Sequence, residues 1–165
     1  MKYSDFDNTV LKSIKILISD VDGVLTDGGL YYSASGILLK RFNVKDGMAI
    51  KLLHEADIKS GIISSDKSTI IKARAETIKM DYVLIGEWNK KEAAEKICSE
   101  LGITLNNLAF IGDDVNDIPL LQAAGFSACP SDAVTSVKEA VHFVSDISGG
   151  NGVFRQIAEM ILTVR

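Results

Sequence analysis

Residues 14–23 have the sequence Ile14-Lys-Ile-Leu-Ile-Ser-Asp-Val-Asp-Gly23, which predicts a buried strand that ends in two carboxylates. These carboxylates, Asp20 and Asp22, are two positions apart on a strand that is just ending, so both can face one crevice. A lone Asp-x-Asp is common in solvated turns. Here an apolar strand delivers both acids to one edge, and Gly23 lets the backbone approach a ligand closely.

The rest of the chain alternates similar apolar strands with amphipathic helices. Strands are predicted at 59–64, 82–85 and 108–112, and helices at 46–56, 67–78 and 90–101. Weaker strands at 126–128 and 142–144, a Gly-rich loop at 149–152 and a helix to about residue 164 follow. This alternation predicts an α/β fold: a Rossmann-like parallel sheet with helices on both faces. Ligands bind such sheets beyond the carboxyl ends of the strands.

One stretch, residues 29–43, interrupts the alternation. Its two apolar runs around the turn Ser33–Gly36 predict a β-hairpin flap. The chain contains no internal repeat, low-complexity segment or linker. We therefore predict a single domain over residues 1–165.

A second acidic stretch, Asp113-Asp-Val-Asn-Asp117, follows the strand at 108–112. Its three acids would repel one another unless a cation neutralises them, and oxygen ligands suit a hard ion such as Mg²⁺. A helix N-terminus, where acids are favoured, is the alternative explanation for Asp114 and Asp117. That alternative does not explain why a second acidic pair lies at the same edge.

Composition excludes several classes of function. The net charge of −4, with no basic stripe, argues against a nucleic-acid partner, and the lysines, Lys40 among them, are spaced singly as on a solvated surface. Cys98 and Cys129 have neither a redox nor a zinc spacing and are expected to be free thiols, as in a reducing compartment. The polar N-terminus predicts no signal peptide, and no apolar run is long enough to span a membrane. A cytoplasmic protein is expected.

Four motifs in this order resemble those of the haloacid dehalogenase superfamily of aspartyl-phosphate phosphatases. They are Asp20–Gly23, then Ser64 after a buried strand, then Lys90 with Lys91 as a near alternative, and finally Gly112–Asp117. Each motif falls at the end of a predicted strand or shortly after it. Singly, Ser64 or Lys90 would be ordinary surface chemistry, but four motifs in order are specific.

The resemblance implies a role for each catalytic residue. Asp20 would be the nucleophile that attacks phosphorus, and Asp22 would be the general acid and then the general base. Ser64 would donate a hydrogen bond to the transferring phosphoryl group, and Lys90 would neutralise its charge.

The resemblance also implies Mg²⁺ as the cofactor. Asp20, Asp113 and the backbone carbonyl of Asp22 would hold the ion. Asp114 and Asp117 would be further ligands or would orient the ligands.

The intervals between the motifs indicate which branch of the superfamily is involved. Residues 20–64 have room only for the hairpin and one helix, and residues 64–90 only for one helix and one strand, so no cap domain is expected. Over nearly its full length the chain resembles the capless 3-deoxy-D-manno-octulosonate 8-phosphate phosphatases, a family that includes 2-keto-3-deoxynononate 9-phosphate phosphatases. The shared stretches are 20–28, 42–47, 74–76, 111–114 and 149–155.

This closer resemblance implies a small-molecule partner, a sugar-acid phosphate, and a homotetramer in which the hairpin, with Tyr31 and Tyr32, helps to complete a neighbouring site. The residues implied in substrate binding are Phe42, Asn43, Val44, Lys45, Asp46, Ser65, Asp66 and Arg74. Asp66 replaces the Arg usual in octulosonate phosphatases and favours a nine-carbon substrate, whereas Thr77 resembles the octulosonate enzymes. The sequence therefore does not decide between the eight-carbon and the nine-carbon sugar acid as substrate. It also does not decide whether the pathway leads to lipopolysaccharide or to sialic-acid-like sugars.

Two other functions compete with this interpretation. An open site admits large substrates, so a phosphomutase or a protein phosphatase of the same fold is one rival. The other is a non-catalytic subunit or oligomerisation domain, like the phosphatase-like domain fused to some sialic-acid-activating enzymes. The presence of every catalytic position argues against the second rival.

Overall fold

The computed structural model describes residues 8–165; residues 1–7, part of the N-terminus interpreted above as lacking a signal peptide, lie outside the described residues. Six parallel strands form one sheet in the order β5-β4-β1-β6-β7-β8. The strands are β1 (Ile16–Ser19), β4 (Lys59–Ser64), β5 (Tyr82–Ile85), β6 (Leu108–Ile111), β7 (Phe126–Cys129) and β8 (Phe143–Val144). The predicted α/β fold with a parallel sheet is confirmed.

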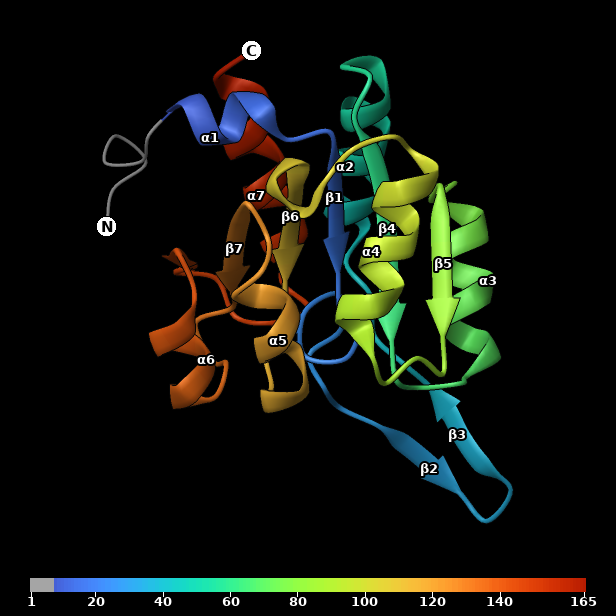
Figure 1. The fold of residues 1–165 in the computed structure, drawn as a ribbon. Helices are drawn as coiled ribbons and strands as arrows, with labels where there is room; N and C mark the ends of the chain where they lie inside the picture. Colours follow the sequence, from blue (N-terminus) through green and yellow to red (C-terminus); the bar gives the residue numbers. More distant parts are fainter. Residues whose placement is uncertain (1–7) are drawn as a thin grey trace.

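Helices cover both faces of this sheet (Figure 1). They are α1 (Asn8–Ser13), α2 (Val44–Glu55), α3 (Thr69–Thr77), α4 (Lys90–Glu100), α5 (Ile118–Leu121), α6 (Thr135–Ala140) and α7 (Val153–Thr163). One hydrophobic core contains residues of α2, α3 and α7, and the other contains residues of α4, α5 and α6. Three of these helices, α1, α5 and α6, were not predicted, because four to six residues are too few to show a helical period.

Strand β1 lies at the centre of the molecule. Its side chains alternate between the two cores: Leu17 packs with α2 and α7, and Ile16 and Ile18 pack with α4 and α5. All four residues of β1 are buried, as expected for a strand covered on both faces. This position puts the acids that follow β1 in the middle of the sheet edge.

The neighbours of β1 bring the predicted motifs to the same edge. Strands β4 and β6 both pair with β1 in parallel, so the three strands end side by side. The pairing continues past β1, since the N–H of Asp20 donates to the carbonyl of Ile111 at 2.8 Å. Ser64, Asp20 and Asp113 therefore come from three adjacent strand ends.

The predicted flap is the antiparallel hairpin of β2 (Tyr31–Ser33) and β3 (Gly36–Leu39). It projects beyond the carboxyl ends of the strands, at the bottom of Figure 1. Between residues 20 and 64 the chain forms only this hairpin and α2, so the described residues contain no cap in that interval. No helix within residues 8–165 has the length and apolar character to cross a membrane.

Candidate active site

Asp20 is the first residue after β1, and its carboxylate is held by two groups. Oδ1 accepts the N–H of Val21 at 2.7 Å, and Oδ2 lies 3.0 Å from Nζ of Lys90. Lys90 is the first residue of α4, which begins there because the side chain of Asn89 accepts the N–H of Glu92. The start of this helix therefore fixes a cation beside the candidate nucleophile.

The structure distinguishes the two candidate lysines. The Lys90 side chain is only 1% exposed and also bonds Oδ1 of Asp117 at 2.6 Å. Lys91 is turned to solvent, 4.0 Å from Glu95 one helical turn away. Lys90 is thus the lysine of the acidic cluster.

The acidic cluster itself joins the ends of β1 and β6. One carboxylate oxygen each of Asp20, Asp113 and Asp117 lie within 4.8 Å of one another. Asp117 is oriented by the backbone, because its Oδ2 accepts the N–H groups of Asp113 at 3.0 Å and Asp114 at 3.4 Å. Gly23 is required here: a Cβ at that position would lie 2.0 Å from Oδ2 of Asp113, and its φ of +82° suits glycine.

The cluster carries more negative charge than Lys90 balances. Burial, followed by the charges of Asp20 and Asp117, raises the pKa of Asp113 to about 8. Burial and the charge of Asp117 likewise raise the pKa of Asp20 to about 7, against the opposing effect of Lys90. In the same environment the carboxylates outweigh the desolvation of Lys90, whose pKa is raised. Three crowded carboxylates with one ammonium group fit a divalent cation bound through oxygen.

The two remaining acids of the motifs point their carboxylates elsewhere. Asp114 is exposed, and its Oδ1 caps the N–H of Val115 at 2.7 Å, so the helix-start explanation accounts for it. Asp22 has its Oδ1 bonded to the hydroxyl of Thr26 at 3.1 Å and its Oδ2 bonded to Nζ of Lys40 at 2.5 Å. Neither the Asp114 nor the Asp22 side chain belongs to the group of carboxylates that could hold a metal ion. The predicted contribution of Asp22 to the metal site is therefore its backbone carbonyl alone.

The prediction that Lys40 lies on the solvated surface is wrong. Its side chain is completely buried and forms ion pairs of 2.5 Å with both Asp22 and Asp66. Burial alone would lower the pKa of the Lys40 ammonium group, but the hydrogen bonds to these two carboxylates outweigh burial and raise the pKa. Lys40 is therefore a charged residue of the site that the sequence analysis missed.

The last residue of β4 and the loop that follows it contain three of the predicted residues. Ser64 is buried and its Oγ accepts the N–H of Asp66 at 3.2 Å. Asp66 accepts the N–H of Ser68 at 2.8 Å and the ammonium group of Lys40, and these bonds lower its pKa against the effect of burial. Ser65 lies between them, half-buried. This loop faces the flap through Lys40.

The predicted substrate residues of 42–46 are divided between structural and exposed positions. Asn43 caps α2, since its Oδ1 accepts the N–H of Lys45 at 3.0 Å. Arg74 lies 5.9 Å from the ring centre of Phe42 and donates to the carbonyl of Asn43 at 3.1 Å. Asp46 is buried, and its Oδ1 accepts the N–H of Arg155 at the start of α7 at 3.0 Å. Asp46 therefore joins α2 to α7.

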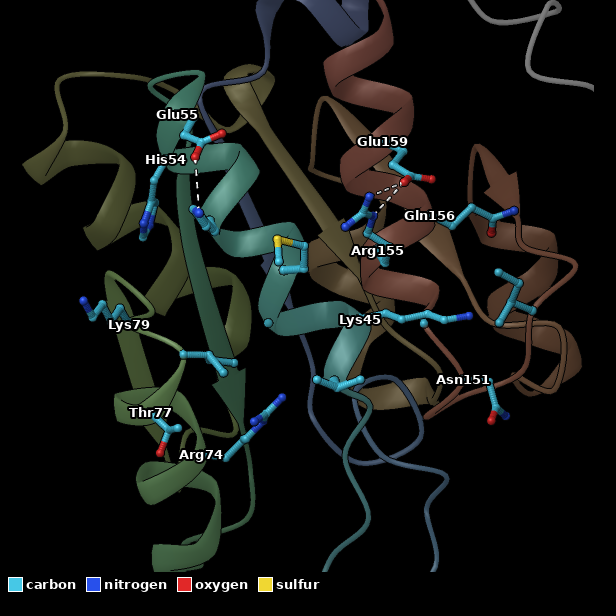
Figure 2. Close-up of a pocket in the computed structure, with 17 residues that line it drawn as sticks. Lys45, His54, Glu55, Arg74, Thr77, Lys79, Asn151, Arg155, Gln156 and Glu159 are labelled. Atoms are coloured by element: carbon cyan, nitrogen blue, oxygen red, sulfur yellow. Dashed lines mark hydrogen bonds and ion pairs between the residues drawn. The ribbon is translucent and has the colours of Figure 1, made fainter.

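An open groove of about 1320 Å³ runs along α2, between α3 and α7 (Figure 2). It is lined by the predicted substrate residues Val44, Lys45 and Arg74, together with Arg155 of α7. None of the acidic cluster lines it. The structure thus separates Ser65 and Asp66, near the acids, from Val44 and Lys45 of α2 and Arg74 of α3, which line the groove.

The Gly-rich loop also supports the site, a role that the sequence did not reveal. A Cβ on Gly149 would lie 2.0 Å from the carbonyl oxygen of Gly23, and the N–H of Gly150 donates to the carbonyl of Val24 at 2.9 Å. The loop therefore packs directly behind the chain that carries Asp20 and Asp22. Its glycine content was a visible signal, but its contact partner was not.

Comparisons with known proteins agree with this geometry. Residues 41–157 match the family model described as haloacid dehalogenase-like hydrolase. The chain is 41% identical, over 92% of its length and 84% of the relative's, to 3-deoxy-D-manno-octulosonate 8-phosphate phosphatase of Haemophilus influenzae. It is 34% identical to the phosphatase of the same name from Escherichia coli K12, over 92% of this chain and 80% of that one.

Solved structures give the same assignment. The cobalt-bound Haemophilus influenzae phosphatase superposes with a TM-score of 0.90 at 40% identity, over 94% of this chain and 91% of that one. The Moraxella catarrhalis phosphatase, solved in complex with a magnesium ion, a phosphate ion and a KDO molecule, superposes with a TM-score of 0.92 at 30% identity. This match covers 96% of this chain and 91% of that one. The chain therefore belongs to the haloacid dehalogenase-like hydrolases and, within them, to the family of the 3-deoxy-D-manno-octulosonate 8-phosphate phosphatases, which are phosphoric monoester hydrolases.

Proposed function

We propose that this chain is a Mg²⁺-dependent phosphatase that hydrolyses the phosphate monoester of a 2-keto-3-deoxy sugar acid through an aspartyl-phosphate on Asp20. The observation that carries the proposal is the buried carboxylate of Asp20 at the end of the central strand, 3.0 Å from Lys90 and beside the oxygens of Asp113 and Asp117. This combination joins a fixed nucleophile, a fixed cation and a set of oxygen ligands at one sheet edge.

The first step transfers the phosphoryl group to the protein. An oxygen of Asp20 attacks phosphorus, the new P–O bond forms, and the bond from phosphorus to the sugar oxygen breaks. Asp22, protonated, gives its proton to the departing oxygen. Ser64, whose hydroxyl accepts the N–H of Asp66, can donate its own proton to a phosphoryl oxygen, while Lys90 offsets the developing charge.

The second step releases phosphate. Water attacks the phosphorus of the aspartyl-phosphate and gives its proton to Asp22, and the bond to Asp20 breaks. Inorganic phosphate leaves, Asp20 is a carboxylate again, and Asp22 again carries a proton. Mg²⁺ held by Asp20, Asp113 and the backbone carbonyl of Asp22 supplies positive charge against the phosphate and the acids. Asp117 orients Asp113 by accepting its backbone N–H, and it orients Lys90 through their ion pair.

The first candidate substrate is 3-deoxy-D-manno-octulosonate 8-phosphate, the substrate in the names of the relatives, which would make the chain part of lipopolysaccharide synthesis. A nine-carbon 9-phosphate is the second candidate, because Asp66 occupies a position where the octulosonate enzymes usually have Arg. The ion pair between Asp66 and Lys40 weakens that argument, since the carboxylate already has an ammonium partner within its own chain, one that it shares with Asp22.

The assembly is proposed to be a homotetramer. The flap exposes four large apolar side chains: Leu30, Tyr31, Tyr32 and Leu39. An apolar patch of this kind indicates a surface that another chain covers, and a site without a cap needs such cover to exclude water. The buried free thiols of Cys98 and Cys129 fit a reducing compartment such as the cytoplasm.

The experiment that tests the function is a ranking of kcat/KM for 3-deoxy-D-manno-octulosonate 8-phosphate, 2-keto-3-deoxynononate 9-phosphate and N-acetylneuraminate 9-phosphate, with Mg²⁺ and with chelator. We expect the octulosonate ester to rank first, and all activity to vanish with chelator and return with Mg²⁺. Turnover of none of the esters would favour the non-catalytic alternative. Full activity in chelator would contradict the metal requirement.

A further inference from the structure

We infer that Lys40 is a positioning residue of the reaction: from the base of the flap it holds the carboxylate of Asp22 toward the leaving group and ties it to Asp66 beside Ser64. This inference rests on the proposed function, because it assigns a task to a residue that acts through the leaving-group acid. It adds a residue of the flap to the catalytic motifs.

The burial of Lys40 is the first support. Its side chain is fully buried, whereas the next residue, Arg41, keeps half of its side chain exposed and reaches Asp27 only at 3.4 Å. A buried ammonium group without partners would be strongly destabilising, so Lys40 is at this position because carboxylates are there to receive it. The two carboxylates are those of Asp22 and Asp66, each at 2.5 Å.

The second support is the orientation of Asp22. Thr26 donates to Oδ1 at 3.1 Å and Lys40 donates to Oδ2, so both oxygens of the carboxylate are held from within the chain. One third of the Asp22 side chain remains exposed at the sheet edge. A group that must deliver a proton to one oxygen gains rate from fixed geometry, and a misplacement of about 1 Å can cost about 10²-fold.

The third support is the connection between two loops. Asp66 binds Lys40 through Oδ2 and the N–H of Ser68 through Oδ1, and its own N–H donates to Ser64. The path Asp22–Lys40–Asp66–Ser64 therefore joins the loop after β1 to the loop after β4. Because Asp66 is a second partner, Lys40 stays fixed without depending on Asp22 alone.

A purely structural role for Lys40, in docking the flap, makes a different prediction. Loss of docking would disturb substrate binding and would affect all phosphate esters alike. Loss of Asp22 orientation would slow the first step at saturating substrate, and would do so most for esters whose leaving oxygen needs a proton. Alkyl esters have such an oxygen, whereas an aryl oxygen departs readily as the anion.

The test is the rate constant of the first step in Lys40→Met, measured as release of the alcohol in the first turnover at saturating substrate, in the full chain with Mg²⁺. The two substrates are 3-deoxy-D-manno-octulosonate 8-phosphate, an alkyl ester, and 4-nitrophenyl phosphate, an aryl ester. The second step also uses Asp22 and is the same for both esters, so it is kept out of the measurement. We expect the first-step rate constant to fall about 10- to 100-fold for the alkyl ester, part of the effect of general acid catalysis, and several-fold less for the aryl ester. Asp22→Asn should show the same pattern more strongly. Lys59→Met, which removes a lysine bonded to Asp81 at the opposite end of β4, should change neither rate constant.

A second variant covers the case in which Lys40→Met does not fold. Asp66→Asn changes a partly exposed residue and keeps the Lys40–Asp22 pair. It should lower the alkyl-to-aryl ratio of the first-step rate constants in the same direction by a smaller factor. An equal loss for both esters, or a change in KM alone, overturns the inference while the phosphatase function stands. An inactive wild-type chain with both esters overturns the proposed function, and the inference with it.

Discussion

The carboxyl edge of the sheet and the hairpin flap are built in opposite ways. At the edge, Asp20, Lys90 and Asp117 are almost completely buried and are fixed by bonds to one another and to the backbone. On the flap, Tyr31 and Tyr32 are more than half exposed, and the segments that lead into and out of the hairpin meet at an isolated β-bridge between Thr26 and Phe42. The edge is complete within one chain, whereas the flap presents a surface without cover.

The difference indicates that the reacting groups and the cover over the substrate come from different parts of the molecule. The groups that would attack phosphorus and offset its charge need no second chain, because the sheet already brings them together. Enclosure is different, because between residues 20 and 64 the chain forms only the hairpin and α2 and no cap, so a bound sugar acid would depend on the flap or on another chain for cover. Lys40 is the exception, since its backbone lies at the base of the flap and its ammonium group contacts Asp22 and Asp66 at the edge.

Among the residues of the sheet edge, Asp20 should lose the most activity on substitution. Asp20→Asn replaces a carboxylate nucleophile by a neutral amide, and we expect kcat to fall by more than about 10³-fold. The measurement is phosphate release with the best substrate of the panel. Asp114→Asn is the matched control: it removes an exposed carboxylate that only caps Val115, and it should retain activity. Comparable losses in the two variants would show that the edge has no unique nucleophile.

A neighbouring pair of lysines tests whether position at the edge matters. Lys90→Met removes the cation between Asp20 and Asp117, and we expect kcat to fall about 10²- to 10³-fold, as for the loss of one charge-stabilising donor. Lys91→Met removes a solvated lysine and should leave kcat unchanged.

Circular dichroism controls for unfolding in the lysine pair, because breaking a buried ion pair costs about 3–5 kcal/mol of stability. Lys90→Arg, which keeps the charge, is the second variant for the case in which Lys90→Met unfolds. Equal activity of a folded Lys90→Met and Lys91→Met would contradict the role of Lys90.

Substitutions on the flap should change the oligomeric state and KM more than the rate of the chemical steps. Tyr31→Glu combined with Tyr32→Glu places charge on the exposed apolar face, and we expect light scattering to show smaller oligomers than the proposed tetramer. KM should rise about 10-fold or more through lost substrate contacts, while a single turnover at saturating substrate changes little. A fully active wild-type monomer would rule out a shared site.

The smallest effect concerns Asp46, a buried acid outside the cluster. Burial raises its pKa to about 6, partly opposed by the bond from Arg155, and its Oδ2 finds no hydrogen-bond partner within residues 8–165. The folded state therefore binds the proton more tightly than the unfolded state does. The stability that this provides is fully present below pH 4 and is lost as pH rises through 6.

Thermal unfolding of Asp46→Asn against the wild type measures this effect. The variant carries no charge at any pH, so its Tm should match the wild type near pH 4 and exceed it by several degrees at pH 7. The difference corresponds to at most about 3 kcal/mol. A Tm difference that stays constant from pH 4 to 7 would contradict the pKa assignment.

Sequence reasoning was accurate where local pattern and burial coincide. Strands β4 and β5 begin and end at the predicted residues, since each is a short apolar run. Helix α2 begins two residues before its predicted start, because Asn43 caps it, and that cap was a readable signal. The order of the motifs also predicted that Asp20, Lys90 and Asp113 meet at one edge.

Features that depend on distant residues could not be predicted. Lys40 is buried only because Asp22 and Asp66, 18 and 26 residues away, converge on it, and nothing in its own segment signals this. The groove along α2 depends on how α3 and α7 flank that helix. The helix-start explanation was correct for Asp114 and holds for Asp117 in part. Oδ2 of Asp117 accepts the N–H of Asp114 at the helix start, whereas its Oδ1 bonds Lys90.

The account depends most on a covalent bond between phosphorus and Asp20. The direct measurement uses Asp22→Asn, in which the second step is slowed, quenched with acid during turnover of 4-nitrophenyl phosphate and then reduced with borohydride. Reduction converts an aspartyl-phosphate to homoserine, so peptide mass spectrometry should find homoserine at position 20 and unmodified Asp113 and Asp117. Homoserine at another acid, or none at position 20 in a variant that is turning over, would contradict the account.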